Sequence, residues 1–177
     1  EGSFEITAPM FVQLLKAVLY GDLLMLLYNQ CKPYELVRNK TDDVLDKWQK
    51  RLGKHFEEKT SLSMSKTYKA ILDDFAKIER SSKKKIKVGI VGEIYVKYSP
   101  LANNHLEEFL LSEGCEPVVP SLLEFVLYCA ITNVVNGKLY GYINKKSILN
   151  KIGYDLIYSA QKKMIKIIKA HGVFEPM

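Results

Sequence analysis

A short β-branched run in the middle of an otherwise helical pattern restricts the possible folds most strongly. Residues 86–92 read Ile-Lys-Val-Gly-Ile-Val-Gly, and a second short apolar run follows at 116–119. Such runs are typical of strands buried in a parallel sheet. Because a helix is predicted over about 102–113, the two runs predict one strand–helix–strand unit with the usual right-handed crossover.

Helical periodicity governs the remaining sequence. Apolar residues recur at spacings of three and four over about 10–30. Because they are more numerous than one buried face needs, they predict a helix packed between two layers. Further helices are predicted from Thr41, from Ser63 or Ser65, over 121–133 and over 147–170, with a turn at Asn136-Gly137. The last helix is expected to point these side chains toward a core: Leu149, Ile152, Leu156, Met164 and Ile168.

The order of these elements predicts a helix-rich α/β fold. We expect a mainly helical region over 1–82 and a Rossmann-like lobe with a C-terminal helix over 83–177. A parallel sheet normally has more than two strands, and this sequence indicates only two, near 86–92 and 116–119. The sheet is therefore expected to be incomplete, and the chain to be a fragment of a longer protein.

The formal charge of +6 comes almost entirely from residues 141–177, which hold 7 Lys or Arg against 2 Asp or Glu. Lys162, Lys166 and Lys169 fall on one helical face, which could bind phosphate or could be a solvated surface. No nucleic-acid-binding motif accompanies them, so nucleic acid is not an expected partner. The run of three lysines at 83–85 is expected to be a solvated link.

The apolar runs and the cysteines indicate the compartment. No apolar run approaches the ~20 residues of a membrane span, and the acidic first residues do not resemble a targeting signal. We therefore expect a cytoplasmic protein that does not contact a membrane. Cys31, Cys115 and Cys129 lack paired spacing, so disulfides and a zinc site are not expected. Cys31 and Cys129 are expected to be buried, inert thiols.

The loop after the first predicted strand is the best candidate for a site. Ligands of open α/β sheets bind beyond the carboxyl ends of the strands, near the start of the next helix. There we expect Glu93 as a catalytic group, with substrate bound by Gly92, Tyr98, Asn103 and Asn104. The alternative is that Ser99, Asn103 or Asn104 only caps a helix, with Pro100 in its first turn.

Common catalytic motifs are absent from the sequence. Gly89 and Gly92 do not form GxGxxG, and there is no Walker sequence, no HExxH and no GxSxG. The three histidines are scattered, so no metal site is predicted from them. The sequence therefore does not support a dinucleotide site, an NTP site or a hydrolase triad.

Residues 87–104, continuing through 113–120 to 125–128, resemble the 2-hydroxyacyl-CoA dehydratase superfamily. The resemblance is nearest to large bacterial proteins named CoA-substrate-specific enzyme activase or activase-related, which join ATPase domains to a dehydratase-like region. Residues 28–35 are similar to their Arg-Pro-Tyr-Glu segment, with Lys32 where Arg is usual.

The resemblance implies anaerobic electron-transfer chemistry. Dehydratase subunits of this superfamily hold a four-iron four-sulfur cluster, which passes one electron to a 2-hydroxyacyl-CoA, and an ATP-hydrolysing activase supplies that electron. One of their cysteines commonly follows the first strand, where this chain has Glu93, and a second follows the next strand, where this chain has Ser-Leu-Leu-Glu at 121–124. Since thiolates are the usual cluster ligands, we expect no cofactor in this fragment and a possible cluster only in the parent protein.

The resemblance thus predicts a dehydratase-like lobe that serves ATP-driven, low-potential electron transfer to a CoA thioester or similar substrate. Its expected partners are activase or dehydratase-like domains of the same or a sister chain, and acyl-CoA. Whether the parent is a lyase or an activase component stays open, and the fragment alone is expected to be inactive. The alternative is a non-catalytic interaction module that docks an activase or sister subunit through the region before residue 82.

Overall fold

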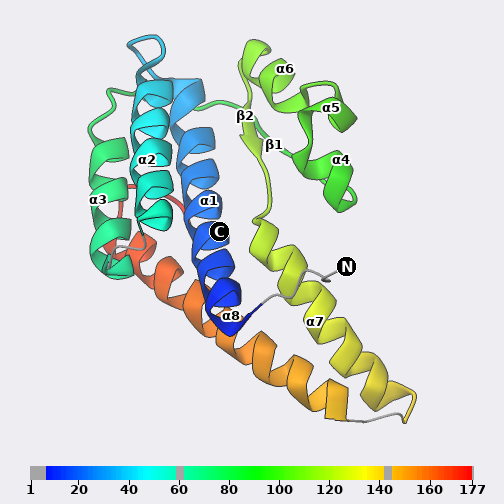
Figure 1. Cartoon of the computed structure of the whole chain (residues 1–177). Coiled ribbons are helices and arrows are strands. Elements are labelled where there is room, and N and C mark those ends of the chain that lie inside the picture. Colours follow the sequence, from blue (N-terminus) through cyan, green and yellow to red (C-terminus); the bar gives the residue numbers. More distant parts are fainter. Residues whose placement is uncertain (1–6, 59–61, 142–144, 177) are drawn as a thin grey trace, which may run out of the picture.

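Four long helices form the larger part of the fold, as Figure 1 shows for a computed structural model that describes residues 7–58, 62–141 and 145–176. They are α1 (Ala8–Cys31), α2 (Lys40–Glu57), α3 (Met64–Ala76) and α8 (Lys145–His171). The predicted periodicity is confirmed for each of them. Their largest fully buried side chains include Leu23, Leu27, Trp48, Ile71, Leu72, Phe75, Met164 and Ile168.

The first helix lies between two layers, as its apolar surplus predicted. It contacts α2 and α3 on one side, and α7 (Leu122–Leu139) and the second strand on the other. The buried carboxylate of Asp22, in the middle of α1, accepts hydrogen bonds from the backbone N–H groups of Leu122 at 2.8 Å and Leu123 at 3.0 Å. Asp22 therefore caps α7 across the layers, and burial raises the pKa of this carboxyl.

The predicted strand–helix–strand unit is confirmed in its parallel pairing. Strands β1 (Lys87–Gly89) and β2 (Glu116–Val118) pair in parallel, with Val88 opposite Pro117. Three short helices connect them: α4 (Ile94–Tyr98), α5 (Pro100–Asn103) and α6 (Leu106–Ser112). Ile90, Leu110 and Val119 form a small separate core under this unit.

The connection differs from the single helix predicted over 102–113, and from the loop expected directly after the first strand. Asn104 and His105 both adopt left-handed conformations, with φ of 53° and 55°, so the helix is interrupted between α5 and α6. Residues 94–98 form a helical turn because Glu93 caps it. The prediction of one continuous helix was therefore wrong at a local break that the apolar spacing does not reveal.

The strands are less buried than predicted. Ile86 and Val91, on either side of β1, are 74% and 81% exposed. Within the described residues the sheet has two strands, so β1 has one unpaired edge. The structure is a helix-rich α/β fold with a small parallel sheet.

Predictions about the last two helices were partly wrong. Helix α7 continues through Asn136-Gly137, where we predicted a turn, because it packs along α8. Met164 and Ile168 are buried as expected, but Ile152 and Leu156 are 60% and 56% exposed because they lie on a different face of α8 from Ile157, Met164 and Ile168, which are buried in the main core. The side chain of Leu149 lies outside the described residues.

Two helices, spanning Ala8–Tyr34 and Leu122–Leu139, are long and apolar enough to cross a membrane. Buried core helices and signal sequences share this property, so the finding is weak evidence of a membrane. Helix α1 contributes Leu19, Leu23 and Leu27 to the main core. The expectation that the protein has no membrane span stays a prediction.

Candidate functional site

The loop after β1 begins with a glycine turn and a capping carboxylate. Gly92 has φ of +152°, and Glu93 follows it at the N-cap of α4. The Oε1 atom of Glu93 accepts a hydrogen bond from the backbone N–H of Val96 at 2.8 Å. This bond satisfies one of the free amides at the start of a helix, as a capping side chain does.

Asn103 is held against the same helical turn. Its side-chain N–H donates to the Val96 carbonyl at 3.0 Å, and its side-chain oxygen accepts from the Leu106 N–H at 3.1 Å. The structure thus brings Glu93 and Asn103 together, because both side chains bind the backbone of Val96. Asn104 is exposed in its left-handed turn. The bond from Leu106 to Asn103 agrees with the capping alternative for Asn103, and a role for Glu93, Asn103 and Asn104 in binding or catalysis stays a prediction.

Tyr98 joins the carboxyl ends of the two strands. Its hydroxyl donates to the Pro120 carbonyl at 2.8 Å, and burial raises the pKa of Tyr98 to about 12. Beside it lies the buried Lys97, whose Nζ is 5.2 Å from the Tyr98 ring centre and 5.9 Å from that of Phe125. Sequence analysis missed Lys97, because nothing in its spacing marks a buried cation.

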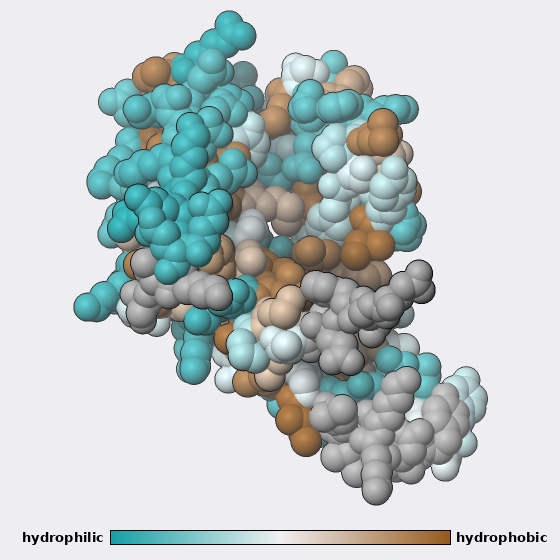
Figure 2. Space-filling model, viewed as in Figure 1, coloured by the Kyte–Doolittle hydropathy of each residue, from teal (hydrophilic) through white to brown (hydrophobic). Residues whose placement is uncertain are grey.

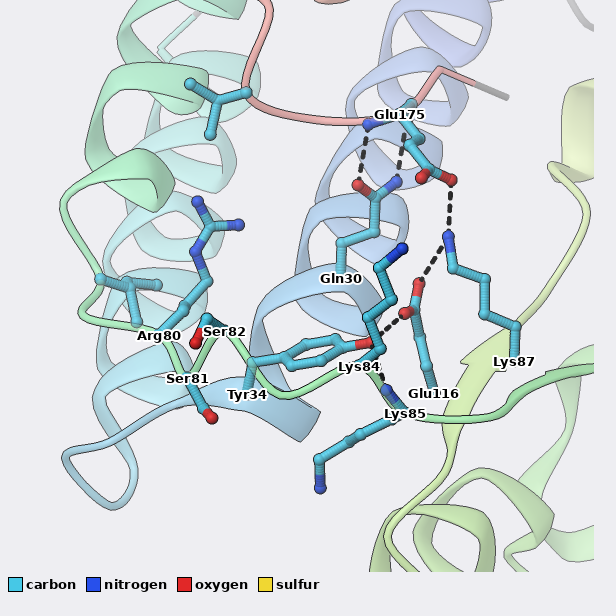
Figure 3. Close-up of a pocket in the computed structure, with 12 residues that line it drawn as sticks. Gln30, Tyr34, Arg80, Ser81, Ser82, Lys84, Lys85, Lys87, Glu116 and Glu175 are labelled. Atoms are coloured by element: carbon cyan, nitrogen blue, oxygen red, sulfur yellow. Dashed lines mark hydrogen bonds and ion pairs between the residues drawn. The ribbon is translucent and has the colours of Figure 1, made fainter.

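A cavity of about 720 Å³, which we call the basic cavity, lies where the end of α1 meets the segment before β1 (Figure 3). Its walls come from the end of α1 and the 3-10 helix η1 (Lys32–Tyr34), from residues 80–87, from β2 and from the segment after α8. Its polar lining residues are Gln30, Tyr34, Arg80, Ser81, Ser82, Lys84, Lys85, Lys87, Glu116 and Glu175. Two of the three lysines that we expected to lie in a solvated link therefore line a cavity.

Hydrogen bonds to Tyr34 fix the backbone of this segment. The Ser81 N–H donates to the Tyr34 carbonyl at 2.8 Å, and the Lys85 N–H donates to the Tyr34 hydroxyl at 3.4 Å. That hydroxyl in turn donates to the buried carboxylate of Glu116 at 2.6 Å. Burial and this bond raise the pKa of Tyr34. The segment is thus fastened at both ends.

The cations of the basic cavity differ in their partners. Lys87 Nζ lies 2.5 Å from the Glu175 carboxylate and 3.5 Å from that of Glu116, and the bond to Glu175 is the main reason why the pKa of Lys87 is raised. The Arg80 guanidinium lies 4.9 Å from the Phe174 ring centre. In the part of the chain that the structure describes, Lys84 makes no ion pair. The cavity therefore holds positive charge that its own carboxylates do not neutralise.

The cysteines of this chain do not fit a four-thiolate cluster. Cys31 is buried and its pKa is raised to about 12 by burial, Cys115 is half-buried, and Cys129 is exposed rather than buried as predicted. Glu93 and Ser121, which lie where the resemblance leads us to expect cysteines at 93 and within 121–124, accept helix-capping hydrogen bonds. Across residues 7–58, 62–141 and 145–176, no three His, Cys, Asp or Glu residues gather as a metal site.

Comparison with protein-family models, with curated proteins and with solved structures gave no match. The resemblance to the dehydratase superfamily therefore rests on the motifs within residues 28–35, 87–104 and 113–128. It stays a prediction, and the role of the chain is a proposal.

Proposed function

We propose that this chain is a dehydratase-like, Rossmann-like lobe of a CoA-substrate-specific enzyme activase-related protein of the 2-hydroxyacyl-CoA dehydratase superfamily. In this proposal the complete protein works anaerobically in the cytoplasm, and takes part in ATP-driven, low-potential electron transfer to a CoA thioester or similar substrate. The lobe itself shapes a site rather than holding a cluster, since its donor residues do not fit one. The ATP-hydrolysing and cluster-binding parts belong to other domains or a sister chain.

The observation that supports this proposal best is the bond from Tyr98 to Pro120. It joins the loop after β1 to the loop after β2, at the carboxyl ends of two parallel strands. Open α/β sheets bind their ligands at this edge. The residues with the dehydratase resemblance form this same edge, which supports a substrate-facing role for the loop of Gly92, Glu93, Asn103 and Asn104.

Anaerobic metal analysis tests the proposal. Iron, acid-labile sulfide and near-visible absorbance are measured in the complete natural protein that contains this chain, and in residues 1–177 alone. We expect a cluster in the complete protein and none in residues 1–177. A complete protein that takes up no cluster after anaerobic reconstitution would contradict the redox role.

A second test separates the capping role of Glu93 from a catalytic one. In Glu93→Gln the side-chain oxygen can still accept from Val96, but the carboxylate charge is lost. We expect ATP-dependent electron transfer to fall while the melting temperature is unchanged. Glu113→Gln, an exposed change at the end of α6, is the matched control. Equal activity of both variants would remove Glu93 from the chemistry.

A second candidate function is docking of an activase or sister subunit, and the start of α1 favours it. Met10, Phe11, Val12 and Leu14 are exposed there, and Figure 2 shows hydrophobic residues gathering in this central part of the view. Exposed apolar patches often mark protein interfaces. Leu14→Glu should then abolish co-purification with the activase, whereas Gln13→Glu, which adds the same charge one residue away, should leave it intact.

A further inference from the structure

The basic cavity has more cationic side chains than its own carboxylates can pair with. Four cationic side chains line it, Arg80, Lys84, Lys85 and Lys87, against the two carboxylates of Glu116 and Glu175. Only Lys87 is paired with these carboxylates within the described residues. A concave surface with excess positive charge attracts anions, because the walls concentrate the field.

The backbone that carries these cations is held by the fold and is not a flexible linker. Residues 81–85 are held to Tyr34 at both ends, and Lys87 begins β1. Figure 3 shows the side chains of Lys84 and Lys87 extending to the same side, toward Gln30 and Glu175, whereas Lys85 points the other way. Lys84 and Lys87 can therefore approach one ligand together. Preorganised charges lose less entropy on binding than mobile ones.

The carboxylate of Glu175 already interacts with one of these cations. It lies 2.5 Å from Lys87 Nζ, and the Glu175 backbone is fixed by Gln30, which donates to its carbonyl at 2.8 Å and accepts from its N–H at 2.9 Å. The cavity thus binds an internal anion at one cation. An incoming anion would compete with Glu175 for Lys87 and would meet Lys84 without competition.

The space also extends beyond the cations. A second cavity of about 300 Å³ adjoins the basic cavity, since both are lined by Gln30, Lys87, Glu116 and Glu175, and it is lined further by Pro117 to Ser121. A single phosphate would fill only a small part of the basic cavity. A ligand with two neighbouring anionic groups and an attached organic body fits it better.

We propose that the basic cavity binds a small molecule that carries a diphosphate group. Lys84 and Lys87 contact the phosphate oxygens, Arg80 supplies further positive charge, and the Ser82 hydroxyl lies in the wall as a hydrogen-bond donor. The organic body of the ligand extends toward the carboxyl end of β2. This inference uses only the cavity and its charges, and does not depend on the proposed function.

Calorimetric titration of the whole chain with inorganic pyrophosphate at low ionic strength tests the proposal, and a parallel titration with ADP tests a diphosphate that carries an organic body. We expect saturable binding that weakens with added salt. Lys84→Gln should weaken the binding about tenfold, because a hydrogen bond between charged groups is lost. Glu175→Gln should strengthen it, because the competing carboxylate is removed.

Lys83→Gln is the matched control, since Lys83 has the same charge on the same segment but does not line the cavity. It should change the affinity less than about twofold, as an exposed charge at a distance does. Tighter binding of ADP than of pyrophosphate would support a diphosphate ligand with an organic body, and the reverse would overturn that part of the proposal. Absence of saturable binding, or equal weakening by Lys83→Gln and Lys84→Gln, would overturn the proposal.

Discussion

The helical core and the small α/β unit differ in how much apolar surface supports them. The core joins four long helices and α7 through many fully buried side chains, among them Leu23, Phe75 and Ile168. The α/β unit has only Ile90, Leu110 and Val119 fully inside, and one edge of β1 is unpaired among the described residues. The comparison indicates that the unit depends on polar links to the core, namely Tyr34 to Glu116 and Asn29 to Glu107.

The largest effect should come from matched leucine truncations in the two regions. Leu72 is fully buried in the helical core and Leu110 is buried in the α/β unit. We expect Leu72→Ala to lower the free energy of unfolding by about 4 kcal/mol and Leu110→Ala by about 2 kcal/mol, since loss scales with the cavity that remains. Urea denaturation measures both. Equal losses would mean that the two regions are supported alike.

The next effect concerns the link between α1 and α7. Asp22→Asn keeps one acceptor oxygen for the two backbone N–H groups and should cost about 2 kcal/mol at acidic pH. Because the pKa of Asp22 is raised in the folded protein, this residue contributes stability below its ordinary pKa of 3.8, and the contribution is lost as pH rises through the raised value. In thermal denaturation the melting temperature of the natural protein should therefore decline between pH 3 and pH 7, and that of Asp22→Asn should lack this decline. The same slope in both proteins would contradict this assignment.

A smaller effect is expected at the link between the core and β2. Tyr34→Phe removes the hydroxyl that bonds Glu116 and the Lys85 N–H, and should cost about 1 kcal/mol. Hydrogen exchange should accelerate over residues 81–87. Tyr98→Phe is the matched control because its hydroxyl bond to Pro120 lies outside that segment. Unchanged exchange in Tyr34→Phe would show that the segment is held by other contacts.

The smallest effect should be seen at the exposed end of β1. Val91 is largely exposed, so Val91→Thr should change the free energy of unfolding by no more than about 0.5 kcal/mol. Its buried neighbour Ile90 provides the contrast, since Ile90→Thr places a hydroxyl in the small core. Chemical denaturation of the two variants measures the difference. A large loss for Val91→Thr would indicate that this residue is covered.

Much of the fold could be predicted from apolar spacing, because α2, α3 and α8 bury one side through many turns and α1 is buried on two sides. The end of α7 could not, because a helical Gly137 costs only about 1 kcal/mol and packing along α8 outweighs it. The break at Asn104 and His105 depends on two backbone conformations that apolar spacing does not encode.

The two candidate sites also differ in whether they could be predicted from the sequence. The loop around Glu93 and Asn103 could be located from the sequence, since it follows a strand directly, and capping was already an alternative there. The basic cavity could not be predicted, because its walls come from Gln30, Tyr34, residues 80–87, Glu116 and Glu175, which are far apart in the chain. Only the serine–lysine run at 81–85 gave a local signal.

The pair of hydrogen bonds between Gln30 and Glu175 also sets an order of assembly. The two residues are 145 positions apart, so closing this contact carries the entropy of a very long loop unless α8 has first packed on the core. During synthesis, α1 leaves the ribosome long before residue 175 exists. The wall of the basic cavity that Glu175 provides is therefore added after the walls from α1 and residues 80–87, and the cavity becomes complete only once α8 has packed on the core.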